Sequence, residues 1–133
     1  MLQYLLFMNE NKKRVLIVED DFQISKVYQI QLEREGIFSI LARNGEEAIE
    51  LLDEARPDLI ILDLMIPRKD GFWVLEEVRK NPKYSNIPIV IISNLGQKDD
   101  KIRALGLGAT EYWVKVNVSI KDIMEKIKLY LEI

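Results

Sequence analysis

Short apolar runs alternate with amphipathic stretches along most of the chain. Runs of four or five aliphatic residues are too short for a helix and indicate strands that are buried on both faces. The second run, FSILA, is weaker than the others and predicts a strand nearer an edge of the sheet. The predicted strands cover residues 15–18, 38–42, 59–63, 87–92 and 111–115.

Between these runs, apolar residues recur at helical spacing. After Asp21, the residues Ile24, Val27, Tyr28 and Leu32 lie on one side of a predicted helix, which Gly36 ends. Further helices are expected after Asn44-Gly45, after Asp70-Gly71, over 98–107, and after Ser119, which is expected to cap the last helix.

Five strand–helix units with wholly apolar strands predict a doubly wound α/β fold, a five-stranded parallel sheet covered by helices on both faces. The crossovers should be right-handed. In such sheets the functional groups lie beyond the carboxyl ends of the strands, at the point where the strand order switches. The residues that follow each strand are therefore the ones to examine.

Composition narrows the function. The 133 residues are 48% hydrophobic and 31% charged, which fits one globular domain. A net charge of −3 gives no reason to expect nucleic acid or a membrane surface as a direct partner. The chain has no cysteine and no histidine, which excludes disulfides, a zinc site with thiolate or imidazole ligands, and a Ser-His-Asp triad.

Residues 1–12 are predicted to be an N-terminal extension of a domain that covers 13–133. Their apolar part precedes the basic residues, the reverse of a secretory signal, and is too short to span a bilayer. One interpretation is a loose tail or an annotation artefact, with Met8 as the natural start. The other is a short strand or helix that docks on the domain or on a second copy. A cytoplasmic location is expected.

Several polar side chains follow the predicted strands. Glu19 and Asp20 end the first strand, Asp63 the third, Ser93 the fourth and Lys115 the fifth. If the strands are adjacent, these groups converge, and the repulsion among the carboxylates favours a bound cation such as Mg²⁺. Taken alone, the acids have a simpler explanation, because the helix dipole favours negative charge near the start of a helix. Asp21 in particular is expected to be a helix cap.

The sequence resembles the receiver domain of two-component response regulators over about residues 13–133. VLIVEDD resembles the family's first strand and acidic pair, and LIILDLMIPRKDG resembles the stretch around its phospho-accepting aspartate. IISN and LGATEYWVK match the stretches that carry the hydroxyl residue, the switch aromatic and the lysine. The resemblance implies a flavodoxin-like (βα)5 receiver fold with strand order 2-1-3-4-5.

The resemblance also implies a mechanism. Asp63 would accept a phosphoryl group from a phosphohistidine of a sensor histidine kinase or phosphotransfer protein. Lys115 and Ser93 would bind phosphoryl oxygens. The metal, Mg²⁺ or Mn²⁺, would be held by Glu19, Asp20, Asp63 and the backbone carbonyl of Met65.

The implied output is a change of surface. Tyr112 would turn inward as Ser93 moves toward the phosphoryl group, although an ordinary half-buried aromatic is the alternative. The helix over 98–107, the strand over 111–115 and the last helix would then bind a downstream protein. Charges of the last helix are expected on this surface, with a plain solvated face as the alternative: Lys121, Asp122, Glu125, Lys126 and Lys128. The chain would not be an enzyme beyond its own phosphorylation and dephosphorylation.

The chain departs from the family pattern beside two site residues. Val116 follows Lys115 where the family usually has proline behind a cis bond, so a trans bond is expected here. Asn94 follows Ser93 where the family commonly has a small residue, which predicts altered phosphorylation or dephosphorylation rates. Trp73 and Trp113 are expected only to pack.

Apolar residues flank the path of an attacking water. Met65 lies two residues after the acceptor, and Leu95 lies two residues after Ser93. We expect these side chains to lengthen the life of a phosphoryl group compared with polar residues there.

Three interpretations remain open, and two others are disfavoured. The chain is either a single-domain receiver or part of a larger regulator or hybrid kinase, and a receiver-like module that binds partners without phosphate is a further possibility. A flavodoxin-like FMN or nucleotide binder is disfavoured, because EDDFQIS offers carboxylates where phosphate would bind. A Mg²⁺-dependent phosphatase is disfavoured because LMIP follows Asp63.

Overall fold

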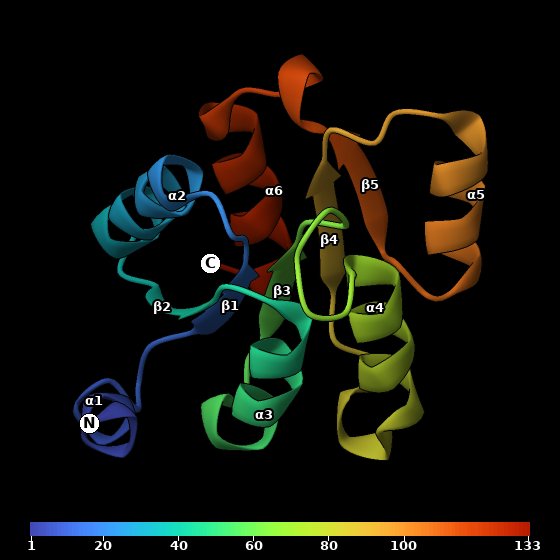
Figure 1. Ribbon diagram of the computed structural model, residues 1–133. Helices are drawn as coiled ribbons and strands as arrows, with labels where there is room; N and C mark the ends of the chain where they lie inside the picture. Colours follow the sequence, from blue (N-terminus) through green and yellow to red (C-terminus); the bar gives the residue numbers. More distant parts are fainter.

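The computed structural model describes residues 1–133 and contains one five-stranded parallel sheet (Figure 1). The strand order is β2-β1-β3-β4-β5, which confirms the expected doubly wound fold and places β2 at an edge. Each neighbouring pair of strands is parallel. The strands are β1 (Arg14–Val18), β2 (Phe38–Ala42), β3 (Leu59–Leu62), β4 (Ile89–Ser93) and β5 (Glu111–Val114).

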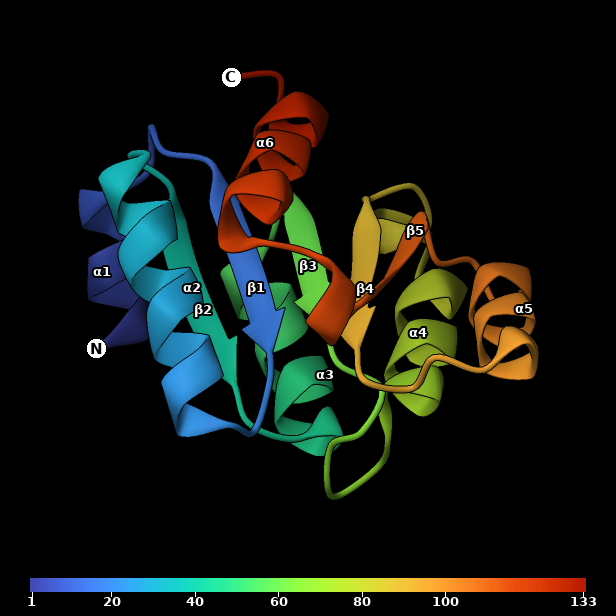
Figure 2. The same cartoon turned by 90° about the horizontal axis from the view of Figure 1, so that it is seen from above.

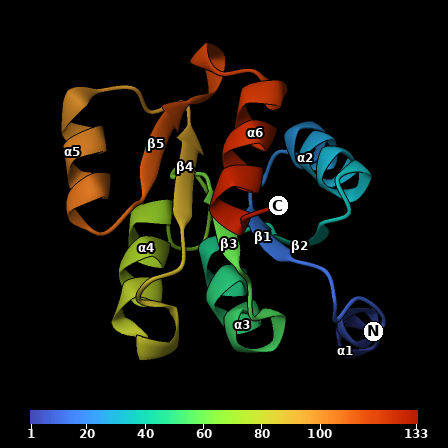
Figure 3. The ribbon, with the colours of Figure 1, turned by 180° about the vertical axis from the view of Figure 1, so that it is seen from behind.

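Each face of the sheet carries its own hydrophobic core, because alternate strand residues point to opposite faces. Helices α2 (Phe22–Arg34) and α6 (Ile120–Leu131) cover one face, where Leu32 and Ile127 are fully buried. Helices α3 (Gly45–Ala55), α4 (Gly71–Lys80) and α5 (Lys98–Gly106) contribute to the core on the other face. Figures 2 and 3 show the two layers from above and from behind.

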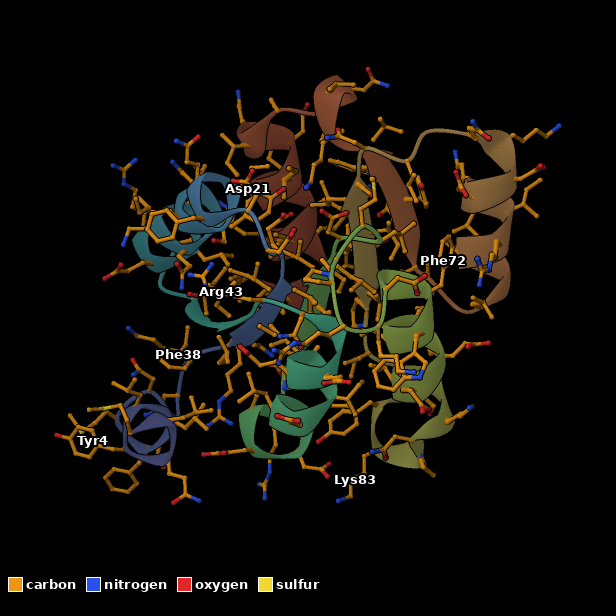
Figure 4. The ribbon with its side chains drawn as sticks, in the orientation of Figure 1. Tyr4, Asp21, Phe38, Arg43, Phe72 and Lys83 are labelled. Atoms are coloured by element: carbon orange, nitrogen blue, oxygen red, sulfur yellow. The ribbon has the colours of Figure 1, made fainter.

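Most helices begin at a residue whose side chain satisfies a free backbone N–H group. Asp21, Asn44, Asp70 and Ser119 each accept a hydrogen bond from the amide three residues further on. Asp21 lies near the top of the molecule, at the start of α2 (Figure 4). The predicted capping roles of Asp21 and Ser119 are thereby confirmed.

Two predicted strand boundaries shift. β4 begins at Ile89 rather than Ile87, because the Ile87 carbonyl accepts a hydrogen bond from the Arg79 guanidinium at 2.7 Å instead of a neighbouring strand. β5 ends at Val114, and Lys115 begins a short 3-10 helix, η2 (Lys115–Asn117). A second 3-10 turn, η1 (Pro82–Tyr84), follows α4.

The N-terminal segment forms helix α1 (Leu2–Met8), which precedes β1 and lies apart from the carboxyl ends of the strands (Figure 1). Leu6 is buried and Leu2 packs against the same core, whereas Tyr4 points away from the domain (Figure 4). The segment is therefore a helix that contacts the core through Leu2 and Leu6, and Met8 as the natural start stays a prediction. No helix in the structure has the length and apolar character needed to cross a membrane.

Candidate functional site

The registers of four neighbouring strands, β1, β3, β4 and β5, place the predicted site residues at one end of the sheet. Val18 of β1 is paired with Leu62 of β3, so Glu19 and Asp63 leave adjacent strands at the same level. Ser93, the last residue of β4, is paired with Val114 of β5, so Lys115 follows directly beside it. The structure therefore brings all four side chains to one end of the sheet, as the sequence predicted.

Lys115 lies between two buried carboxylates. Its ammonium is 2.7 Å from Asp63 Oδ2 and 2.7 Å from Glu19 Oε2. The Glu19 and Asp63 side chains are only 2% and 6% exposed, and that of Lys115 is 13% exposed. The stem of Lys115 borders an apolar pocket of about 230 Å³ between α2 and α6, with Tyr28 on its wall. Removal from water strengthens the attraction of this triad.

Backbone amides orient both carboxylates. The Met65 N–H donates to Asp63 Oδ1 at 3.0 Å, and the Asp21 N–H donates to Glu19 Oε1 at 3.1 Å. Asp63 is thus held by an amide on one oxygen and by Lys115 on the other. These contacts fix the direction of the carboxylate expected to accept a phosphoryl group.

The electrostatics of the triad reflect crowding of like charges. Burial, together with the nearby Asp63 charge, raises the pKa of Glu19 despite the hydrogen bond from Lys115. Burial opposes the charge of Lys115, but its hydrogen bonds to Asp63 and Glu19 outweigh this and raise the pKa of Lys115. Asp20 adds a third carboxyl group to the cluster, so one ammonium is present for three carboxyl groups.

This carboxyl cluster fits a hard divalent cation. Glu19, Asp20 and Asp63 each offer a carboxylate oxygen, and these atoms lie within 4.8 Å of one another. Asp20 is exposed, so the cluster opens to solvent on one side. Mg²⁺ prefers such sites, because it binds carboxylate oxygens and keeps several of its waters. A cation here would offset the repulsion that burial strengthens.

A chain of hydrogen bonds leads from the site to β5. Ser93 is fully buried, and its Oγ accepts the Leu95 N–H at 3.4 Å. The Leu95 carbonyl in turn accepts a hydrogen bond from the Tyr112 hydroxyl. Tyr112 is 8% exposed and already points inward. The sequence singled out Ser93, Tyr112 and the apolar side chain of Leu95, but not the role of the Leu95 carbonyl, because a backbone carbonyl carries no signal in residue type.

The departures from the family pattern lie at the rim of the site. The structure contains no cis peptide bond, so the Lys115–Val116 bond is trans as expected, and Val116 is 80% exposed. Asn94 is exposed and Met65 is 56% exposed. Both tryptophans pack as expected, Trp73 on one core and Trp113 on the other.

Sequence comparison identifies the family. A family model described as "Response regulator receiver domain" matches residues 15–128. The chain therefore belongs to the response regulator receiver domain family.

Its relatives include longer proteins. The chain is 40% identical over 122 residues to the "Probable transcriptional regulator ycf27" of Guillardia theta, a match that covers 92% of this chain and 46% of the relative. It is 35% identical over 118 residues to the "DNA-binding dual master transcriptional regulator RpaA" of Synechocystis sp., over 89% of this chain and 48% of the relative. The chain spans about half the length of the curated relatives it matches.

Solved receiver structures share the fold. The BeF3-activated N-terminal receiver domain of RstA from Klebsiella pneumoniae has a TM-score of 0.83 at 26% identity, over 91% of this chain and 100% of that one. The Mn(2+)-bound form of response regulator Rcp1 has a TM-score of 0.74 at 32% identity, over 87% and 89% of the two chains.

Proposed function

We propose that this chain is a phospho-accepting receiver domain of a two-component signalling system. Asp63 would take a phosphoryl group from a phosphohistidine of a sensor histidine kinase or phosphotransfer protein. The observation that carries the proposal is the convergence of Asp63 with Glu19, Asp20 and Lys115 at one end of the sheet. Beyond its own phosphorylation and dephosphorylation, the domain would catalyse no reaction.

Asp63 is suited to be the nucleophile. A lone pair of its carboxylate would form the new O–P bond as the P–N bond of the phosphohistidine breaks and its electron pair returns to the imidazole nitrogen. Lys115, which already contacts Asp63 Oδ2, would pair with a phosphoryl oxygen, and the Ser93 hydroxyl would donate to another.

Glu19, Asp20, Asp63 and the Met65 carbonyl would hold the metal. Mg²⁺, or Mn²⁺ in its place, would neutralise charge on the carboxylate and phosphoryl oxygens.

The signal would leave the site through Ser93. A hydrogen bond from its hydroxyl to the phosphoryl group would shift the loop that carries Leu95, whose carbonyl accepts from Tyr112. Phosphorylation would then favour the inward position of Tyr112, because the hydroxyls of Ser93 and Tyr112 both form hydrogen bonds with the backbone of Leu95. Tyr112 and this loop would then act as a two-state element that a local charge biases.

The receiving surface would be made by α5, β5 and α6. On α5, Ile102 and Leu105 are 57% and 42% exposed, so the helix offers apolar side chains to a partner. Figure 4 shows Phe72 between α4 and α5, where Arg103 of α5 stacks 4.0 Å from the centre of its ring. Of the α6 charges, Lys126 and Lys128 are paired with Glu111 and Glu35, so the others are better placed to meet a partner.

The test is the intact mass of the protein after incubation with acetyl phosphate and Mg²⁺. Wild type should gain one phosphoryl group, and the gain should disappear in Asp63→Asn and after chelation of the metal. A phosphorylated Asp63→Asn protein would assign the acceptor elsewhere. No gain in wild type, even with a kinase supplied, would favour a receiver-like module that binds partners without phosphate.

The relatives favour a further role for the same domain within a longer regulator. Those named transcriptional regulators are matched over about half their length. In such a protein this domain would control an output region elsewhere in the longer chain. Phosphorylation-dependent binding of the isolated domain to that region would test this role.

A further inference from the structure

The loop between β3 and α4 carries Met65 and is held at three places: its two ends, its neck and its tip. Its first residue, Asp63, leaves the sheet, and its last, Asp70, caps α4 by accepting the Trp73 N–H at 3.0 Å. The neck of the loop is closed by a hydrogen bond of 3.0 Å from the Gly71 N–H to the Leu64 carbonyl. The third place is the tip, residues 67–69, which lies against the start of α3 (Figures 1 and 2).

The tip of the loop supplies carbonyl groups to the N-terminus of α3. The Gly45 N–H donates to the Pro67 carbonyl at 3.2 Å, and the Glu46 N–H donates to the Arg68 carbonyl at 3.0 Å. These amides belong to the first turn of a helix, where no intrahelical partner exists. Docking thus satisfies two donors of α3 and two acceptors of the loop.

The docked tip has an unfavourable backbone. Arg68 and Lys69 have φ values of +49° and +75°, in the left-handed region that residues with a side chain rarely adopt. Two successive residues in this region persist only when their surroundings hold them there. The hydrogen bonds from α3 to the Pro67 and Arg68 carbonyls are among the contacts that hold the tip.

Glycine at position 45 makes the docking possible. A Cβ atom there would lie 2.2 Å from the Lys69 carbonyl oxygen and 3.0 Å from the Arg68 carbonyl oxygen. Both are backbone atoms, so the tip would have to move away. Asn44 already caps α3, so the helix itself does not require glycine next to it.

We propose that Gly45 is a positioning residue for the metal and phosphoryl site, because it lets the start of α3 hold the loop whose Met65 N–H orients Asp63. The inference rests on the proposed function. Displacement of the tip would move Met65, whose amide donates to Asp63 Oδ1 and whose carbonyl is an expected metal ligand. Gly45 itself touches neither carboxylate nor metal and acts through the loop.

Calorimetric titration of the full chain with MgCl₂ tests this assignment in wild type, Gly45→Ala and a control, Gly106→Ala. Gly106 lies on α5, and a Cβ there meets no atom within 4 Å. We expect Gly45→Ala to raise the Kd for Mg²⁺ about tenfold, as loss of supporting contacts does at other metal sites. The control should match wild type, and circular dichroism should show that both variants are folded.

Hydrogen exchange in the wild-type protein gives a second test that needs no variant. Coupling between two sites is reciprocal, so Mg²⁺ binding at the carboxylates should slow exchange of the Gly45 and Glu46 amides by several-fold. The Lys121 amide, at the equivalent position of α6, should not respond.

The two failures are distinguishable. A wild-type protein that binds no Mg²⁺ would overturn the proposed metal site and this inference with it. Normal Mg²⁺ binding by wild type, with a Gly45→Ala affinity within twofold of it or no change in the Gly45 and Glu46 amides, would overturn only the role of Gly45.

Discussion

Two polar clusters on this domain are built in opposite ways. In the site, the ammonium of Lys115 is the one positive charge shown beside a cluster of three carboxyl groups, and burial raises the pKa of Glu19. In a second cluster, which we call the β5–α6 clasp (Glu111, Trp113, Lys126 and Tyr130), a single carboxylate receives all the donors. Glu111 accepts the Trp113 N–H at 3.0 Å and the Tyr130 hydroxyl, and it pairs with Lys126 at 3.5 Å.

The pKa of Glu111 therefore moves the other way. Burial alone would raise it, but the hydrogen bonds from Tyr130 and Trp113 and the charge of Lys126 lower it overall. Folding favours the charged form of Glu111, so this carboxylate stabilises the fold. Folding disfavours the charged form of Glu19, so its position is not explained by stability. The site is short of positive charge, which suits a ligand cation, and the clasp is complete without one.

The same substitution in the two clusters should have unequal effects. Lys115→Met leaves Glu19 and Asp63 buried without a counter-ion and should lower the free energy of unfolding by about 3 kcal/mol. Lys126→Met, at a side chain 33% exposed, should cost at most about 0.5 kcal/mol. Urea unfolding at pH 7 with EDTA measures both, and equal costs would remove the distinction between the clusters.

Added Mg²⁺ should stabilise the protein only through the site. At a concentration about 100-fold above its Kd, a ligand that binds only the folded state adds about 2.7 kcal/mol. Asp63→Asn removes one carboxylate of the cluster and should lose most of this gain, whereas Glu111→Gln should retain it. Thermal unfolding with and without EDTA compares the three proteins. A shift of equal size in Asp63→Asn would place the cation elsewhere.

The positions of the residues along the chain explain why the site was predicted and the β5–α6 clasp was not. The site residues follow strands whose apolar runs are legible in the sequence, and parallel pairing brings strand ends together. Glu111 and Tyr130 are 19 positions apart on elements that meet only through the packing of α6 on the sheet. No spacing of residues in the sequence predicts the contact between Glu111 and Tyr130.

Two further features could not be predicted from the sequence. From the sequence, Asn44-Gly45 predicts only the start of a helix. Its contact with the β3–α4 loop could not be predicted, because that loop comes more than twenty residues later. The orientation of α1 was equally hidden. Nearly every residue of Leu2–Met8 is apolar, so periodicity could not distinguish the buried Leu6 from the exposed Phe7.

The pH dependence of stability should separate the clasp from the rest of the fold. Because the pKa of Glu111 is lowered on folding, its contribution is present above its ordinary value of 4.5 and is lost as the pH falls through its folded value. Tyr130→Phe removes a donor to this carboxylate and should cost about 1 kcal/mol at pH 7. The cost should shrink in acid, where Glu111 is protonated.

Urea unfolding of wild type and Tyr130→Phe, measured in steps from pH 7 down to the acid limit of the native state, follows this difference. Burial and the hydrogen bond to Glu111 raise the pKa of Tyr130 to about 12, so its contribution should also fade as the pH rises from 10 through that value. Tyr4→Phe, at a tyrosine 62% exposed on α1, is the matched control and should change little at any pH. A cost for Tyr130→Phe that stays constant over that whole acid range would mean that the Glu111 charge is not what the hydroxyl stabilises.

At the rim of the site, substitution should change a rate and leave stability alone. Met65 is 56% exposed and flanks the expected path of water toward a phosphoryl group on Asp63, so Met65→Asn should leave urea unfolding almost unchanged. A polar amide there can orient the attacking water and should shorten the life of phosphorylated Asp63 by a few-fold. The decay of phosphorylated protein after removal of the donor measures it, with Val116→Asn, at another exposed rim residue, as the control. An unchanged decay rate in Met65→Asn would show that the apolar rim does not set the lifetime. The site would then differ from the β5–α6 clasp only in the balance of its charged groups.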